Sequence, residues 1–446
     1  MGDLAYDSVT GKVGKVDGQP ALVEVHTLFV AFGQTSGAPE LPVSMGEVPG
    51  LLQLVAGSLP FLGNDAASDL VAVSGVRATW KAEGTKQEAR LTEGRDWKVG
   101  LSLGNAYRQL QEPLAFFSRG SIAINSLPLA SAIGLFDGDT SAPPKTASHP
   151  DLAAIVLHRT GGAELRDPPS ATPFCDFAAA VWMLSVTGEA VIEPPSDTSL
   201  NLDIPDLTTM VGTAEKFLPI RRLVEAVPID TDRRGPEELL ITFPSYDTCD
   251  KDLSKMGAHG ELLLATFDAK GQPTVKQILS TVGPNQFLLH VRVGDLDGDG
   301  KIDIVAMKPT FDFNGPVQLL SSSIVVMRGK GDGAFEDPIE VPIAGFPIDI
   351  ALVNAEGDSD LEIVVVSELA TADFAPALFV IDWDKSPPDP RVPFKTLLPR
   401  SEASSTASSA LEGPTALAGG DFDGDGVDDV AVAVAGGVRL FKGVAR

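Results

Sequence analysis

Cysteine, histidine and the residue patterns of common hydrolases are scarce or missing in this sequence. The five histidines, among 446 residues, form no spaced metal-binding set, and neither a GxSxG nor an HExxH pattern occurs. The two cysteines, Cys175 and Cys249, are too far apart to make a metal motif. They are compatible with one disulfide in an exported protein or with two unpaired thiols. The sequence therefore predicts no catalytic constellation.

Basic residues and long apolar runs are also lacking. Lys and Arg number 34 against 61 Asp and Glu, which gives a net charge of −27. A surface of that sign repels phosphate backbones, so we expect no nucleic-acid partner. No stretch is long and apolar enough to span a membrane. The opening MGDLAYDSVTGK lacks the features of a secretory signal peptide, so the protein is cytosolic or its export signal lies outside this chain.

The most informative stretch that is present is VGDLDGDGKIDIV. Counted from Asp295, it places carboxylates at loop positions 1, 3, 5 and 9, a glycine at position 6 and a lysine at position 7. Calcium loops use this order, with the backbone carbonyl of position 7 as a further ligand. Ca²⁺ takes about six to eight oxygen ligands, and glycine allows the sharp turn. The predicted ligands are Asp295, Asp297, Asp299, Lys301 and Asp303.

This loop does not match an EF-hand. That motif needs a bidentate Glu at position 12 between two helices, whereas position 12 here is Ala306 and the flanks are rich in Val and Ile. We therefore predict a strand–loop–strand calcium site. The alternative is an acidic surface turn without metal, which we disfavour because its carboxylates would repel one another at close range.

Two further copies of the loop follow. The stretch GGDFDGDGVDDVAVAV repeats the full pattern, and its predicted ligands are Asp421, Asp423, Asp425, Val427 (through its carbonyl) and Asp429. Between the two strong copies, VNAEGDSDLEIVVV has Ser359 in place of the glycine at position 6, which makes the turn harder. Its candidate ligands are Asn354, Glu356, Asp358, Asp360 and Glu362, and whether this loop holds metal stays open.

Weaker copies of the loop pattern lie upstream in the sequence. The stretch IDTDRRGPEELLITF keeps Asp230, Asp232 and Glu238 but has Arg234 at position 5, where it would oppose a cation, so we predict no metal there. GLFDGDT with PDLAAIVL, and FLGNDAASDLVAV, retain only part of the pattern. The last copies recur about every 60 residues, which fits one unit of four short strands plus turns.

The segments around these loops are short and rich in β-branched residues, which predicts strands. The predicted strands of the last complete repeats are residues 223–229, 238–243, 261–268, 274–280, 288–293, 303–308, 321–329, 338–344, 347–353, 361–367, 377–382 and 392–398. The final repeat supplies a third strand but no fourth. Residues 21–32 are predicted as a strand that closes the last repeat or belongs to a divergent first one. Residues 212–223 are the best helix candidate.

The repeats resemble the FG-GAP family, also called VCBS repeats, the units of integrin α-subunit β-propellers and of many bacterial surface proteins. The resemblance rests on VGDLDGDGKIDIV and GGDFDGDGVDDVAV and extends over residues 210–446. It implies an all-β fold: one β-propeller over residues 1–446, with seven or six four-stranded blades and Ca²⁺ between strands A and B. Residues 51–209 are then degenerate repeats, and residues 1–50 a divergent first blade or a ring-closing strand.

The resemblance also implies that the face opposite the calcium loops binds partners. We expect a calcium-binding, non-catalytic module for a protein or glycan partner, located outside the cell, on its surface or in the periplasm. Expanded loops at residues 81–108 and 245–259 are the expected place for the partner. One alternative is a polysaccharide-active propeller enzyme, with Trp80, Trp97 and Tyr107 as a sugar platform, although packing of that loop is the favoured role of these rings. The other is a structural spacer in a larger surface protein.

The predicted strand order also places the two cysteines. Cys175 precedes a third strand, and Cys249 lies between the second and third strands of the next repeat. Both are therefore predicted on the face opposite the calcium loops, in adjacent blades. A disulfide needs Cα atoms about 4.4–6.8 Å apart, which neighbouring loops can reach, and such a bond would favour an oxidising compartment.

Overall fold

The computed structural model describes the strands named below and the connections between many of them. Before residue 224 it describes the strands and residues 135–136 alone. From there it describes residues 224–233, 236–246, 258–267, 273–281, 283, 285–312, 318–358, 360–368, 376–383, 396–397, 416–434 and 437–445. The helix candidate at residues 212–223 lies outside these ranges.

All of the described elements are β-strands, which confirms the predicted all-β class. Among the described residues there is no helix of the length and apolar character that a membrane crossing requires. The twelve predicted strands of the complete repeats are all present. They correspond to β16 (Glu225–Ile229), β17 (Glu238–Tyr246), β18 (Ala258–Phe267), β19 (Pro273–Ser280), β20 (Leu289–Gly294), β21 (Asp303–Asp312), β22 (Gln318–Met327), β23 (Ile339–Ile343), β24 (Phe346–Val353), β25 (Glu362–Glu368), β26 (Pro376–Ile381) and β27 (Thr396–Leu397).

These strands form antiparallel sheets in simple chain order, because each short turn returns the chain beside the strand it has just left. Three sheets have the orders β16-β17-β18-β19, β20-β21-β22-β23 and β24-β25-β26-β27. A fourth has the order β12-β13-β14-β15, from β12 (Ser126–Gly134), β13 (Asp151–Arg159), β14 (Phe177–Val186) and β15 (Ile192–Glu193). The last sheet has three strands, β28 (Ala416–Gly420), β29 (Asp429–Val434) and β30 (Gly437–Phe441).

The N-terminal strands form smaller sheets. One has the order β11-β8-β7, from β7 (Leu51–Gly57), β8 (Asp69–Ser74) and β11 (Lys98–Ser102). The predicted strand at residues 21–32 is β5 (Val25–Val30), which pairs with β6 (Val43–Pro49). The other pairs are β1 (Tyr6–Asp7) with β2 (Lys12–Val13), β3 (Lys15–Val16) with β4 (Gln19–Pro20), and β9 (Thr79–Glu83) with β10 (Lys86–Arg90).

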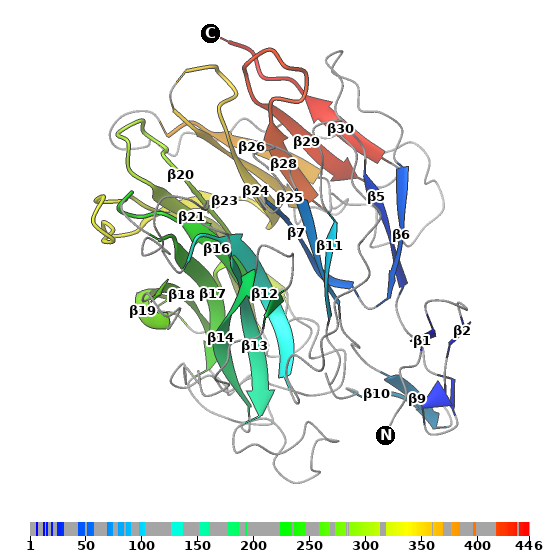
Figure 1. Cartoon of the computed structure of the whole chain (residues 1–446). Helices are drawn as coiled ribbons and strands as arrows, with labels where there is room; N and C mark the ends of the chain where they lie inside the picture. Colours follow the sequence, from blue (N-terminus) through cyan, green and yellow to red (C-terminus); the bar gives the residue numbers. More distant parts are fainter. Residues whose placement is uncertain are drawn as a thin grey trace, which may run out of the picture.

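The first strand of each sheet lies beside the first strand of the next. The series runs β7, β12, β16, β20, β24 and β28. Figure 1 shows the sheets from β12 to β30 following one another from cyan through green and yellow to red. Equivalent loops of successive sheets therefore lie at the same end of the molecule.

The hydrophobic core lies between successive sheets. Side chains of a strand alternate between its two faces, so neighbouring residues enter different cores. On β17, Leu239 and Ile241 join the core shared with the β12–β15 sheet, whereas Leu240 joins the core shared with the β20–β23 sheet. On β21, Ile304 and Val305 divide in the same way. Burial on both faces explains why ELLITF and LEIVVVS are apolar runs without polar alternation.

Candidate metal centre

Four successive loops join the first strand of a sheet to its second strand, and all have the same length. They occupy residues 230–237, 295–302, 354–361 and 421–428, and the position-9 acid is in each case the first residue of the second strand. Neighbouring loops touch: the Asp428 amide donates to the Asn354 carbonyl at 2.9 Å, and the Val444 amide donates to the Ala355 carbonyl at 2.9 Å. The equal lengths place equivalent acids at equivalent points.

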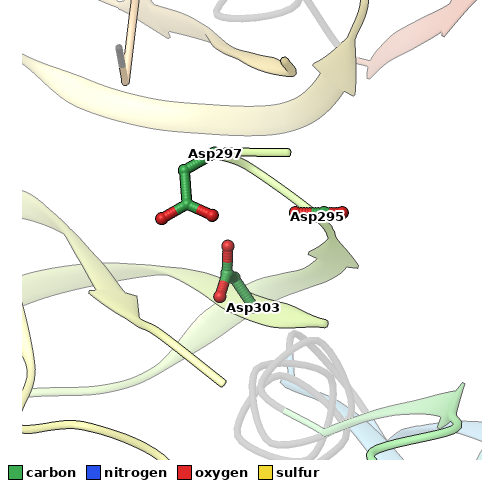
Figure 2. A group of neighbouring side chains, drawn as sticks. All are labelled: Asp295, Asp297 and Asp303. Carbon is green, nitrogen blue, oxygen red and sulfur yellow. The ribbon is translucent and has the colours of Figure 1, made fainter. Parts of the chain in front are cut away.

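The loop at 295–302 brings three of its predicted ligands together. Asp295, Asp297 and Asp303 each offer one carboxylate oxygen, and these oxygens lie within 4.8 Å of one another. Figure 2 shows the carboxylates of Asp297 and Asp303 facing one another, with Asp295 beside them. Asp303 is buried at the start of β21. Three converging carboxylates are a donor set that suits a hard divalent cation.

The loop at 421–428 repeats this arrangement. Asp421, Asp423 and Asp429 each offer one oxygen, again within 4.8 Å of one another, and Asp429 is buried at the start of β29. Gly300 and Gly426, at position 6 of the two loops, have φ of 85° and 87°. This left-handed conformation favours glycine, as the sequence pattern predicted.

Position 4 shows a shared backbone feature that the sequence analysis missed. The residue there has positive φ in all four loops: Arg233 at 55°, Gly298 at 66°, Gly357 at 74° and Gly424 at 81°. Glycine at this position in three loops was the available signal. Arg233 adopts the same conformation despite its side chain, so the weak loop at 230–237 keeps the turn of the strong ones.

The position-9 acid closes each loop through a hydrogen bond from the position-2 amide. The donors and acceptors are Thr231 N to Glu238 Oε2 at 3.0 Å, Leu296 N to Asp303 Oδ2 at 3.0 Å, Ala355 N to Glu362 Oε2 at 2.8 Å, and Phe422 N to Asp429 Oδ2 at 3.2 Å. This acid therefore holds the turn in the protein itself, in addition to its predicted role as a ligand.

In the two strong loops the other oxygen of this acid is also engaged. Asp303 Oδ1 accepts from Gly329 N at 2.8 Å, and Asp429 Oδ1 accepts from Gly443 N at 3.0 Å. Both glycines follow the third strand of their sheet. A Cβ atom on Gly329 would lie 2.2 Å from the Ile302 carbonyl oxygen, and a Cβ atom on Gly443 would lie 2.2 Å from the Asp428 carbonyl oxygen. Only glycine fits this close approach.

In three of the four loops, position 1 carries a buried oxygen without a hydrogen-bond partner among the described residues, whereas both oxygens of Asp421 accept hydrogen bonds. Asp295 Oδ2 accepts from Gly300 N at 2.8 Å, but Asp295 Oδ1 is buried without a hydrogen-bond partner among the described residues. Asp230 Oδ1 and Asn354 Oδ1 are in the same state. Buried oxygens without partners are costly, and a bound cation would satisfy them. The residues present at Asp295 therefore fit the implied Ca²⁺.

Basic side chains of the protein contact the strong loops. Arg328 Nη1 lies 3.2 Å from Asp297 Oδ2, and the Lys442 ammonium pairs with Asp423, so equivalent basic residues reach the position-3 acid in both sheets. The Arg328 guanidinium also lies 6.0 Å from the centre of the Trp383 ring. Both basic residues directly precede the glycines that bind the position-9 acid. This recurring basic–glycine pair was a sequence signal that the analysis missed.

Asp299 and Asp425, at position 5, are not members of the three-carboxylate groups and have other partners. The Lys301 ammonium pairs with Asp299 and lowers the pKa of that carboxyl. Asp425 Oδ1 accepts from Val427 N at 2.9 Å. The structure therefore brings together three of the four predicted side-chain ligands in each strong loop. The carbonyl ligands predicted at Lys301 and Val427 remain predictions.

The third loop, at 354–361, is not one of the compact groups found among the described residues. Asn354 donates from its side-chain amide to the Asp358 carbonyl, and Asp358 Oδ1 accepts from Asp360 N at 3.1 Å. Ser359 lies outside the described residues. Metal binding by Asn354, Glu356, Asp358, Asp360 and Glu362 remains a prediction.

Burial raises the pKa of the position-9 acids Asp303, Glu362 and Glu238. For Asp303 the pKa is about 6, although hydrogen bonds from the Gly329 and Leu296 amides act to lower it. For Glu362 the pKa is about 7, again because burial outweighs the Ala355 amide. Burial also raises the pKa of Glu238. Asp303 and Glu362 therefore lose charge close to neutral pH unless a cation stabilises the charged form.

Several predicted features lie outside the described residues. These are Cys175 and Cys249 with their shared face and disulfide, the rings of Trp97 and Tyr107, and most of the expanded loop at 245–259. Trp80 lies on β9, but its side chain is not described.

Comparison with known proteins adds no relative. No protein-family model matches the chain, and no curated protein matches it. The assignment of the loops therefore rests on their residues and their geometry.

Proposed function

We propose that this protein is a calcium-stabilised β-propeller that acts as a non-catalytic binding module outside the cytoplasm. The observation that supports calcium most strongly is the group of Asp295, Asp297 and Asp303, with one buried oxygen lacking a partner. The Asp421, Asp423 and Asp429 group supports a second site. Bound Ca²⁺ would supply charge neutralisation, while the position-9 acids and the position-4 turns hold the loops in shape.

The propeller assignment is supported by how the sheets follow one another. Successive four-stranded antiparallel sheets adjoin through their first strands and pack their faces together, as blades do. The resemblance to FG-GAP repeats points the same way. We propose seven blades, with six as the alternative, and the β5–β6 pair as part of the first blade.

The proposed binding role rests on the difference between the two ends of the sheets. The loops that follow first strands are filled by carboxylates and their hydrogen bonds, which leaves the opposite end for a partner. Second strands end and third strands begin at that opposite end, as at the pair of Tyr246 and Ala258. We propose a protein or glycan as the partner. Calcium sites of extracellular modules bind at about 10⁻⁴–10⁻³ M, which agrees with a location outside the cytoplasm.

Calorimetry tests the metal part of this proposal. Titrating Ca²⁺ into chelator-stripped protein should show two ions per chain, and a third if the Asn354 loop binds. The variant Asp295→Asn should lose one ion and keep the other, because Asn preserves the size of the side chain but not its charge. Asp421→Asn is the matched variant for the second site. If the unaltered protein shows no heat of Ca²⁺ binding, the proposed sites are refuted.

Partner capture tests the binding part. A glycan array and a pull-down from extracellular fluid should be run with Ca²⁺ and with excess chelator. A saturable partner that needs calcium supports the module. Turnover of a bound polysaccharide would instead establish an enzyme, and the absence of both would favour a structural spacer.

A further inference from the structure

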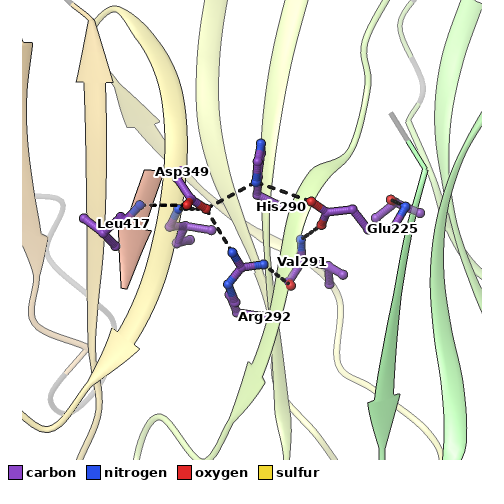
Figure 3. A network of polar contacts seen from close by, with 8 residues as sticks. Glu225, His290, Val291, Arg292, Asp349 and Leu417 are labelled. Carbon is purple, nitrogen blue, oxygen red and sulfur yellow. Dashed lines mark hydrogen bonds and ion pairs between the residues drawn. The ribbon is translucent and has the colours of Figure 1, made fainter. Parts of the chain in front are cut away.

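Away from the loops, a polar network joins the first strands of four successive sheets (Figure 3). Its charged members are Glu225 on β16, His290 and Arg292 on β20, and Asp349 on β24. The network reaches β28 through the Leu417 amide. None of these residues belongs to the candidate metal loops.

Two carboxylates connect one sheet to the next by accepting a backbone hydrogen bond. Glu225 Oε2 accepts from Val291 N at 2.8 Å, which ties β16 to β20. Asp349 Oδ2 accepts from Leu417 N at 2.9 Å, which ties β24 to β28. Each acid stands five residues before its loop, and each donor stands four residues before the next loop. His290 occupies the same position on β20, between the two acids.

At the position where β16 and β24 carry an acid, β20 carries His290, and its imidazole lies between the two carboxylates. Its Nδ1 lies 3.3 Å from Glu225 Oε1 and 3.2 Å from Asp349 Oδ1. Arg292 Nη2 lies 2.9 Å from the same Asp349 oxygen, and Arg292 Nη1 donates to the Val291 carbonyl at 2.9 Å. With a neutral imidazole the two carboxylates exceed the single guanidinium in charge. With an imidazolium the network is neutral.

The backbone is bent to bring the imidazole into this place. The pairing of β20 with β21 shifts between Leu289 and Arg292, so that His290 and Val291 oppose one residue of β21. Such a bulge re-aims a side chain. His290 has φ of 49°, a left-handed conformation that non-glycine residues rarely adopt. The surrounding contacts must hold His290 in it.

We propose that His290 is a proton-dependent clamp: its imidazolium draws Glu225 and Asp349 together and tightens β16, β20 and β24 against one another in mildly acidic conditions. Histidine is the side chain that changes charge between about pH 5 and pH 8. The attraction is present while His290 is protonated, and it is lost as the pH rises and the imidazole becomes neutral. This inference does not depend on the proposed calcium sites or partner.

The other charged groups on the strands beside His290 are its two carboxylate partners or have contacts of their own. The charged residue of β16 is Glu225, and that of β24 is Asp349. On β21, Asp303 accepts hydrogen bonds from the Leu296 and Gly329 amides, Lys308 pairs with Glu340, and Asp312 lies at the end remote from the pairing with β20. Arg292 keeps its charge throughout.

Asp349 stays charged across the range in which the clamp acts. Burial raises its pKa, but the hydrogen bond and charge of His290, the Leu417 amide and Arg292 outweigh burial, and the net pKa lies below the usual 3.8. Its contribution to stability is therefore present above that value and lost only as the pH falls through its lowered folded pKa. The clamp is accordingly closed while Asp349 is charged and His290 is protonated.

The test compares urea unfolding of the full chain at about pH 5.5 and pH 8, in saturating Ca²⁺, with that of His290→Asn. Asn tolerates positive φ and carries no charge, so the backbone is preserved. We expect the unaltered protein to gain about two- to fivefold in its folded-to-unfolded ratio on acidification relative to this variant, the size expected of a partly exposed ion pair.

Glu225→Gln provides a second variant, because glutamine keeps an acceptor for the Val291 amide while removing the charge. It should reduce the acid-dependent gain, and it decides the matter if His290→Asn does not fold. If the first variant, or the second in its place, retains the full gain of the unaltered protein, the clamp is refuted.

Discussion

The loop carboxylates and the first-strand carboxylates are both crowded acids in a strongly acidic chain, but they are balanced differently. Glu225 and Asp349 receive backbone amides from the next sheet and the side chains of His290 and Arg292. In the loop at 295–302, Asp295 keeps a buried oxygen without a hydrogen bond. The comparison teaches that the protein's own donors satisfy the first-strand acids, whereas the Asp295 loop leaves an oxygen for an external cation.

The two regions also differ in what their geometry serves. The loops hold three carboxylates within one small volume inside a single sheet. The first-strand network spreads its charges over β16, β20 and β24 and so connects sheets. Removing a cation should therefore destabilise the loops, and changing the pH should change the strength of the contacts between β16, β20 and β24.

Chelation should produce the largest effect and should separate the two regions. Removing Ca²⁺ leaves like charges close together, and one site at a hundredfold excess of ligand over Kd contributes about 2.7 kcal/mol. Scanning calorimetry should show a lower unfolding temperature in excess chelator, which Mg²⁺ restores poorly because it demands tighter octahedral geometry. His290→Asn should show the same drop. An unchanged unfolding temperature would contradict a structural role for calcium.

Gly329→Ala should have the next largest effect. It tests the hydrogen bond that the Gly329 amide donates to the loop acid Asp303. The added Cβ would lie 2.2 Å from the Ile302 carbonyl oxygen and would disturb the hydrogen bond from the Gly329 amide to Asp303. Overpacking of this kind costs about 1–3 kcal/mol. Urea unfolding measures the loss. Gly424→Ala is the control, since its Cβ would meet no atom within 4 Å and only its φ of 81° opposes it.

Acidification of the metal-free protein should have a smaller effect through Glu362. Its folded pKa of about 7 lies above the ordinary 4.5, so the folded state favours the protonated carboxyl, and stability rises as the pH falls through 7. Between pH 8 and pH 6 the gain should be about 1 kcal/mol, at 1.36 kcal/mol per pKa unit. Glu362→Gln should lack this gain in urea unfolding, whereas His290→Asn should keep it. Equal pH dependence of Glu362→Gln and the unaltered protein would count against the raised pKa.

Asp299→Ala should have the smallest effect on calcium binding. Its carboxylate pairs with Lys301 and lies outside the group of Asp295, Asp297 and Asp303. Calorimetry should show a weakened first site, with both ions still bound and the second site unchanged. Asp295→Asn is the matched comparison and should lose the first ion. Equal losses in the two variants would show that the loop rearranges to bring Asp299 onto the ion.

The strands and their loops could be predicted from the sequence. Runs of β-branched residues such as the IVVV of LEIVVVS predicted strands, and the spacing of Asp295, Asp297 and Asp303 predicted a turn that gathers carboxylates. These features are local, because side-chain alternation and glycine conformations depend on neighbours along the chain. The position-4 turns and the basic–glycine pairs were also present in the sequence, but their meaning requires knowing which backbone approaches which.

The long-range contacts were decided only by the tertiary structure. Arg328 reaches Asp297, and Gly329 reaches Asp303, because the third strand returns the chain beside the loop. In the sequence His290 is one residue of the predicted strand 288–293, and its position between Glu225 and Asp349 depends on residues 65 and 59 positions away. Sequence determines which side chains can form a strand or a turn, whereas their partners across sheets depend on how separate strands pack. That packing buries Asp303 and Glu362 and so raises the pKa of both acids.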